Sequence, residues 1–239
     1  MPSKIHCYLL LCVCLFFSPT RKSVGDEPPP PSKETQKYRQ LVQQLVSPNK
    51  QPKTQNRSDG AVRFPEGYDK KAQQRVAVAR NTLHDNLEAA LPALVEGLGD
   101  NRYSMTIEWA EGDAYYNRSV GTICSSIIES NLEVYRDKMS FTGPSHWNAY
   151  RYKVISEEWY RTRQGRTLAE LQIEAIDWAI KKRMEESPDD IQDFRKNEVA
   201  DLQKLRDEIA KANKPAKPRG LAPMVTSNRG RFDSSEGTK

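Results

Sequence analysis

Residues 68–98 have the sequence YDKKAQQRVAVARNTLHDNLEAALPALVEGL, and this stretch decides the fold class. Its apolar residues recur at the three- and four-residue spacing of an amphipathic helix. Pro92 would disrupt a single long helix, because its ring clashes with the preceding turn and it lacks an N–H group. The stretch therefore predicts two helices, or one kinked helix, with a corner at residues 84–86 and an end at Gly97.

Helical spacing returns downstream, and one segment departs from it. Residues 103–109 alternate apolar and polar side chains, which predicts a half-buried strand, and residues 114–116 can pair with it as a hairpin. The further helical segments are residues 119–135, 146–164, 167–184 and 188–209. We therefore expect a mainly α fold: a compact bundle of about five to six helices with a small β-hairpin, flanked by disordered N- and C-terminal segments.

Residues 1–25 resemble a secretory signal peptide. A single early cation, Lys4, precedes the apolar run 5–17, which is shorter than the ~20 residues that span a bilayer as a helix. We expect a secreted or extracytoplasmic protein, periplasmic or in the cell envelope, that is cleaved near Gly25 and has no transmembrane span in its mature chain. The alternative is that the leader stays uncut as a membrane anchor.

The rest of the chain divides by composition into three parts. Residues 26–67 form a proline-rich tether that contains a short amphipathic helix near residues 38–46, followed by loop over residues 47–65. Residues 68–210 form the helical domain. Residues 211–239 contain prolines, glycines and few apolar side chains, so they predict a basic disordered tail.

Composition and charge exclude several classes of protein. The 239 residues are 37% hydrophobic and 29% charged, which is close to a globular average and excludes collagen-like and multi-span membrane proteins. The net charge of +5 comes from the two ends: the leader contributes three cations, and the tail has seven basic and two acidic groups, which leaves residues 26–210 at −3. We do not expect nucleic acid as a partner, because the tail has only Phe232 for base stacking.

The sequence contains no catalytic signature, metal-ligand spacing or phosphate-binding loop. We therefore predict no catalytic residue, no metal site and no cofactor. Once the leader is removed, Cys124 is the only cysteine, so an intramolecular disulfide cannot form. Its apolar neighbours predict a small buried core residue and not a reactive thiol.

The strongest candidate for a binding site is a group of aromatic and basic side chains near the start of one predicted helix. Aromatic residues and arginine supply much of the binding energy at protein interfaces. The candidate binding residues are His146, Trp147, Tyr150, Arg151 and Trp159. We expect an exported, non-enzymatic helical interaction domain, whose partner is an unknown protein or envelope component.

An enzyme is the alternative. Glu108, Asp113 and His146 could supply acid and base groups if the fold brought them into one cleft. The protein would then be an exported hydrolase acting on an anionic cell-envelope polymer.

One short stretch resembles a HEAT-type helical repeat. In that family an Ala-Leu-Pro-Ala-Leu run opens the second helix and a Gly/Asp pair closes it, and within residues 79–100 the run at residues 90–94 and Gly99-Asp100 match this pattern. The resemblance covers only about residues 70–100, and no second copy follows at the ~40-residue period of that family. It implies a helix pair and carries no function.

Overall fold

The computed structural model describes residues 33–55, 60–109, 114–132, 155–185, 192–218 and 220–230. The chain divides into two units, Met1–Pro30 and Pro31–Lys239, and all the described residues belong to the second. The predicted leader, residues 1–25, lies outside the described residues.

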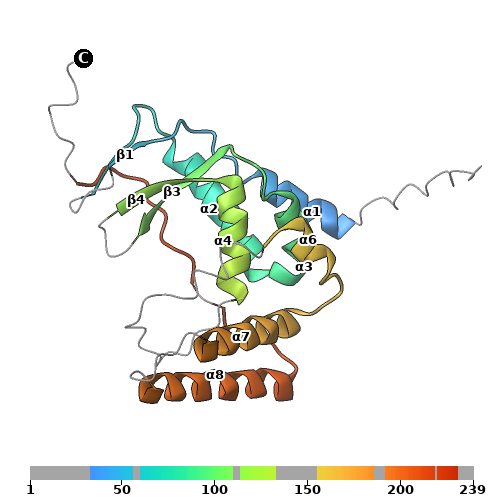
Figure 1. Cartoon of the computed structure of the whole chain (residues 1–239). Helices are drawn as coiled ribbons and strands as arrows, with labels where there is room; N and C mark the ends of the chain where they lie inside the picture. The colour runs from blue at the N-terminus through green and yellow to red at the C-terminus, as the bar shows by residue number, and fades with distance from the viewer. Residues whose placement is uncertain are drawn as a thin grey trace, which may run out of the picture. The chain divides into compact units, whose positions relative to one another are not determined.

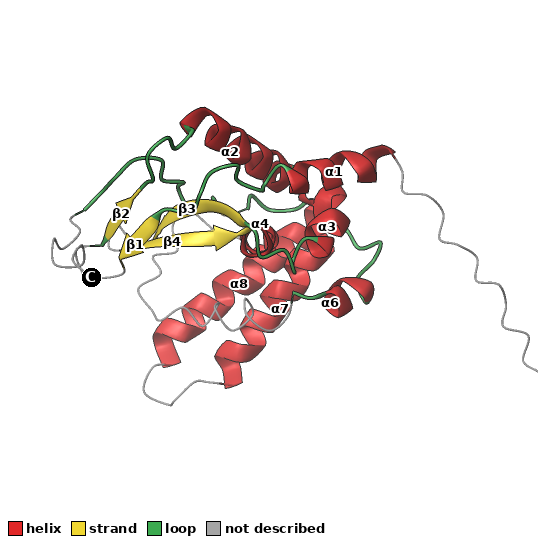
Figure 2. Ribbon diagram, turned by 90° about the horizontal axis from the view of Figure 1, so that it is seen from above, coloured by secondary structure: helices red, strands yellow, loops and turns green. Residues whose placement is uncertain are grey.

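The described residues are mainly helical, as the sequence predicts (Figure 1). Two small antiparallel hairpins accompany the helices (Figure 2). The described helices are α1 (Lys33–Gln43), α2 (Lys70–Asp85), α3 (Leu87–Glu96), α4 (Val120–Leu132), α6 (Glu157–Arg161), α7 (Leu168–Glu185) and α8 (Gln192–Ala212). The strands are β1 (Lys53–Gln55), β2 (Ala61–Arg63), β3 (Tyr103–Trp109) and β4 (Ala114–Ser119).

Helix α1 is the amphipathic helix expected within the tether, but it belongs to the folded unit. Tyr38 and Val42 are buried on the face that packs against α3. Arg39 donates two hydrogen bonds of 2.7 and 2.6 Å to the carboxylate of Glu96 at the end of α3. The folded part therefore begins at least as early as residue 33, and not near residue 68.

Helices α2 and α3 confirm the predicted helix pair and its corner. The side chain of Asp69 caps α2 by accepting a hydrogen bond of 2.8 Å from the Ala72 amide. Asn86 separates the two helices, at the corner predicted from residues 84–86. Pro92 lies within α3, six residues beyond the corner at Asn86.

Strands β3 and β4 form the predicted hairpin, with Ile107 opposite Tyr116. The prediction that β3 is only half buried is wrong, because residues 104–107 are buried on both faces. Ser104 and Thr106, on the polar face, have no exposed surface. Their polar groups are covered because α2 and a C-terminal segment pack against this strand.

A second hairpin lies where the sequence predicts only loop. Strands β1 and β2 pair in antiparallel register, with Thr54 opposite Val62. Each strand has three residues, too few to show the alternation from which strands are predicted.

The apolar interior of the described part has one main core, a smaller cluster between α7 and α8, and a third cluster of Val62, Tyr115 and Val225. Helices α1 to α4 and α6 contribute to the main core together with β3, and α4 is buried on most of its surface. Helices α7 and α8 lie side by side in both views and enclose the smaller cluster between them (Figures 1 and 2). Its buried members are Ala169, Ile176, Ala179, Leu202, Leu205 and Ile209.

Residues 220–230, here called the C-terminal strap, correct the prediction of a disordered tail from residue 211. Helix α8 continues to Ala212, and the strap then pairs with both hairpins. Met224 lies opposite Ile107 of β3, and Arg229 lies opposite Val62 of β2. The folded body therefore extends at least to residue 230, because backbone pairing with strand edges orders a segment whose composition resembles that of a linker.

Candidate functional site

Four of the five residues predicted to bind a partner, His146, Trp147, Tyr150 and Arg151, lie outside the described residues. The fifth, Trp159, is on α6 and is only 5% exposed. It belongs to the main core, so the expectation of a surface aromatic at this position is corrected. The apolar spacing of its helix could have indicated this, since the same pattern is typical of a core-facing tryptophan.

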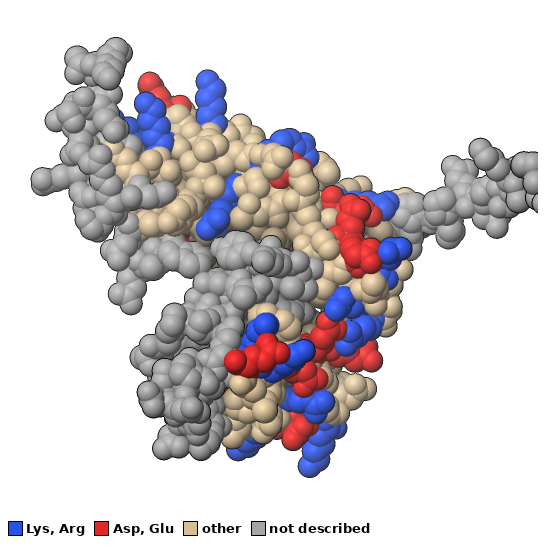
Figure 3. Space-filling model, in the orientation of Figure 1, with Lys and Arg blue, Asp and Glu red and all other residues tan. Residues whose placement is uncertain are grey.

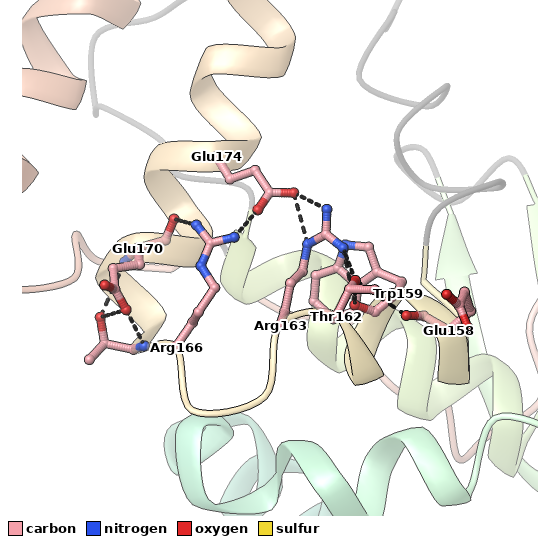
Figure 4. Close-up of polar contacts among 8 residues, drawn as sticks. Glu158, Trp159, Thr162, Arg163, Arg166, Glu170 and Glu174 are labelled. Atoms are coloured by element: carbon pink, nitrogen blue, oxygen red, sulfur yellow. Dashed lines mark hydrogen bonds and ion pairs between the residues drawn. The ribbon is translucent and has the colours of Figure 1, made fainter.

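Trp159 supports a polar cluster that joins α6 to α7 (Figure 4). The guanidinium of Arg163 lies over the indole ring, 5.2 Å from its centroid. The same guanidinium donates a hydrogen bond of 3.1 Å to the carbonyl of Trp159. The aromatic face and the carbonyl together fix the direction of the Arg163 side chain.

Glu174 of α7 accepts hydrogen bonds from both arginines of the segment that connects α6 to α7. Arg163 and Arg166 each donate to its carboxylate, and the contact from the Arg163 Nε is 2.8 Å. Burial opposes ionisation of Glu174, but the hydrogen bonds from the two arginines outweigh it and hold the pKa of the carboxyl below its usual value. A carboxylate paired in this way holds α7 to the segment that precedes it, and it is a poor general base.

Helix α7 begins with a capping box, in which Thr167 and Glu170 exchange hydrogen bonds between side chain and backbone. The Thr167 amide donates a hydrogen bond of 2.7 Å to the Glu170 carboxylate, and the Glu170 amide donates one of 3.3 Å to the Thr167 hydroxyl. These bonds lower the pKa of Glu170. On the face shown in Figure 3, acidic and basic side chains are interspersed around these helices, and no single sign of charge dominates there.

A second polar cluster lies between α2, β3 and the strap. Gln73 is fully buried and donates a hydrogen bond of 2.7 Å from its side-chain amide to the carbonyl of Ser104. Arg80 is 8% exposed and donates one of 2.9 Å to the carbonyl of Ala222 in the strap. Burial lowers the pKa of Arg80, and no carboxylate pairs with it among the described residues.

The strap is bound mainly through its backbone. The Glu108 amide donates to the carbonyl of Pro223 at 3.1 Å, and the Val225 amide donates to the carbonyl of Thr106 at 2.9 Å. Further on, Val62 and Arg229 exchange two backbone hydrogen bonds of 2.9 and 3.1 Å. We call the residues that receive the strap, Val62, Phe64, Arg80, Thr106 and Glu108, the strap-binding edge.

Side chains of the strap complete the contact. Val225 is 3% exposed and packs with Val62 and Tyr115. The side chain of Asn228 accepts a hydrogen bond of 2.8 Å from the Phe64 amide. The sequence does not indicate the strap-binding edge, because its contacts with the strap are made mainly by backbone groups. The only local signal is the short apolar run at residues 221–225.

The candidate acid and base groups of the hydrolase hypothesis are not brought together among the described residues. Asp113 and His146 lie outside them. Glu108 is described, and its carboxylate pairs at 3.5 Å with the guanidinium of Arg229 from the strap. The one described member of the set is therefore part of the strap contact.

Metal ligands and membrane spans were searched among the same described residues. No group of three or more His, Cys, Asp or Glu side chains there could hold a metal ion. None of the described helices combines the length and the apolar character needed to cross a bilayer.

The chain matches no protein-family model, and no curated protein or solved structure is detectably similar to it.

Proposed function

We propose that this chain is an exported, non-enzymatic interaction domain that binds an extended segment of a partner polypeptide along the strap-binding edge. One observation carries the proposal: the edges of β2 and β3 already hold an extended peptide, residues 220–230, through backbone hydrogen bonds and a buried valine. Addition of an extended peptide to a sheet edge is a common mode of protein recognition.

The connection to the strap favours exchange with a partner segment. Only residues 213–219 separate the end of α8 from the strap. A short tether keeps the strap near its edge at an effective concentration on the order of millimolar, so the strap acts as an intramolecular competitor. A partner segment present well below that concentration displaces the strap only if it binds the edge correspondingly more tightly than the strap does.

The test uses the full chain and a fluorescent peptide with the sequence of residues 220–230, GLAPMVTSNRG. In a strap-released variant, Val225→Asp with Gly230→Val, the intramolecular strap is weakened while the strap-binding edge is unchanged. We expect this variant to bind the peptide at least about tenfold more tightly than the wild-type chain, measured by fluorescence anisotropy.

The control variant is Gly220→Val, since nothing lies within 4 Å of the Cβ atom it would introduce. It should bind the peptide as weakly as the wild-type chain does. A scrambled peptide should not bind to the strap-released variant. The proposal is wrong if the peptide fails to bind the folded strap-released variant, or binds no better than the scrambled sequence.

Export rests on the pattern of residues 1–25 and has its own test. Intact mass and N-terminal mapping of the native protein after cell fractionation should give a new terminus near Asp26 in an extracytoplasmic fraction. An uncut chain in the membrane fraction would instead support the anchor, and an uncut cytosolic chain would contradict export.

A further inference from the structure

The backbone contacts of the strap restrict where a bound segment can contain proline. The amide of Val225 is used by Thr106, so proline is excluded at that position. The strap has a proline two residues earlier, at Pro223, where only the carbonyl takes part in the pairing. The edge therefore requires an extended segment with a free amide beside β3.

Two adjacent apolar residues anchor the segment on opposite sides, as expected for neighbouring residues of an extended chain. Met224 packs against the main core, and its sulfur lies 3.8 Å from the side-chain nitrogen of Gln73. Val225 enters the separate cluster that contains Val62 and Tyr115. A polar residue at the position of Val225 would be placed against apolar side chains.

The end of the strap adds polar contacts. The side chain of Asn228 accepts from the Phe64 amide, and the guanidinium of Arg229 lies 3.5 Å from the carboxylate of Glu108. These side chains are three and four residues beyond Val225, so they select spacing as well as residue type.

The last position accepts only glycine. Gly230 has a φ of +70°, a conformation that residues with side chains rarely adopt. A Cβ atom there would lie 2.1 Å from the carbonyl oxygen of Gly60 and 2.9 Å from the Cα of Ala61. Both contacts are with backbone atoms, so a rotamer change cannot relieve them.

We infer that the strap-binding edge recognises partner segments with the pattern apolar-apolar-x-x-Asn-basic-Gly, in extended conformation. This inference rests on the proposed function and specifies the partner by its chemistry. The glycine selects by steric exclusion, the apolar pair supplies the buried surface, and the basic residue fixes the register through Glu108.

The experiment measures binding of substituted peptides to the full-length strap-released variant by fluorescence anisotropy. Glycine→valine at the position of Gly230 should weaken binding at least about thirtyfold, since two backbone clashes and an unfavourable φ act together. The same substitution at the position of Gly220 should change binding less than about twofold, because nothing lies near that position. Arginine→glutamate at the position of Arg229 should weaken binding about fivefold, because the ion pair is partly exposed.

Exchanging the charges of Glu108 and the peptide arginine distinguishes recognition of the basic residue from a general loss of affinity. The strap-released variant that also contains Glu108→Lys should bind the arginine→glutamate peptide to within about twofold of the original pair, and should bind the unchanged peptide about fivefold more weakly. Circular dichroism on each variant establishes that it is folded.

The outcomes separate the two proposals. If the unchanged peptide binds but the glycine→valine peptide binds within twofold of it, the recognition pattern is wrong and the proposed function stands. If the charge exchange restores nothing, Glu108 does not select the basic residue, and that element of the pattern is overturned. If no peptide binds any folded variant, the proposed function itself fails.

Discussion

The guanidinium of Arg80 on α2 and the carbonyl of Ala222 in the C-terminal strap, 142 positions apart in the sequence, are joined by a hydrogen bond of 2.9 Å. Arg80 is 8% exposed and has no carboxylate partner among the described residues. Burial of an arginine is costly, and here the charged group is directed to the backbone of the strap. This bond links α2 to the last described segment of the chain.

Arg80→Met should loosen the strap while leaving the domain folded. Methionine retains much of the apolar stem and removes a costly buried charge, so the free energy of unfolding should change by less than about 1 kcal/mol. The lost hydrogen bond should speed exchange of the Val225 amide, which donates to the carbonyl of Thr106, about tenfold, measured by hydrogen–deuterium exchange. The exposed Arg75→Met on the same helix is the control and should leave exchange unchanged. Unchanged exchange in Arg80→Met would contradict a role in holding the strap.

Glu174→Gln should destabilise the domain at neutral pH and have a smaller effect in acid. Because the pKa of Glu174 is below its usual value in the folded state, its ion pairs stabilise the protein above the unfolded pKa of about 4.3 and are lost as the pH falls through the folded pKa. At pH 7 the variant should be less stable by about 1–2 kcal/mol, a reduced figure because the carboxylate still contacts solvent.

The measurement is urea denaturation of both chains from pH 7 to pH 3. The difference in free energy of unfolding should shrink below about pH 4, where the wild-type carboxyl becomes protonated. Glu158→Gln is the control, since its pair with Arg161 is well exposed on both sides and should contribute less than about 0.5 kcal/mol. A difference that stays constant with pH would show that Glu174 acts through packing and not through charge.

Cys124 should react with thiol reagents only when the domain unfolds. Its side chain has no exposed surface, and burial, with a further contribution from the charge of Asp100, raises the pKa of the thiol to about 12. Labelling with iodoacetamide at pH 8 followed by peptide mapping should leave Cys124 unmodified in native protein and modify it fully in 8 M urea, a standard denaturing concentration. Rapid labelling of the native chain would contradict its place in the core.

The elements predicted best from the sequence are those whose burial follows from local periodicity. The helix pair at residues 70–96 shows the three- and four-residue spacing along its whole length, and its corner coincides with Asn86. The capping box at Thr167 and Glu170 follows from the sequence in the same way, because both partners of each hydrogen bond lie within one turn. In such elements the sequence contains the complete local interaction.

The elements missed are those stabilised by distant partners. Strand β2 and the strap pair across more than 160 positions through Val62 and Arg229, and nothing within either segment indicates the other. Trp159 was assigned to the surface because its aromatic character suits an interface as well as a core, and only the packing of α6 decides between them. In each case the structure of the element is decided by the distant part of the same chain that packs against it. The local sequence of the element does not identify that part.

Gln172→Met should destabilise the contacts of α7 with Asn131 and Ala216. The fully buried amide of Gln172 donates to the carbonyls of Asn131 and Ala216 at 2.9 and 3.1 Å, and its oxygen accepts from the Ala216 amide at 2.8 Å. Methionine fills a similar volume but leaves three backbone groups without a partner, so urea denaturation should show a loss of about 2–4 kcal/mol. The exposed Gln203→Met on α8 should cost less than about 0.5 kcal/mol. Equal effects of the two substitutions would mean that water replaces the lost hydrogen bonds.

Gly121→Ala should be among the most damaging small substitutions in the protein. A Cβ atom at residue 121 would lie 2.1 Å from the carbonyl oxygen of Leu98 and 2.8 Å from its carbonyl carbon. The backbone cannot easily move away, because the Gly121 amide donates a hydrogen bond of 2.8 Å to the carbonyl of Asp100. We expect a loss of about 3 kcal/mol or more in the free energy of unfolding, from urea denaturation.

Gly99→Ala is the matched control for this close approach, since nothing lies within 4 Å of the methyl group it would add. It should change the free energy of unfolding by less than about 1 kcal/mol. Helix α4 begins at Val120, and because Gly121 has no side chain the helix can pack directly against residues 98–100, which follow α3. If Gly121→Ala were as stable as Gly99→Ala, α4 would have room to shift against α3, and the close contact at Leu98 would not be needed to hold the main core.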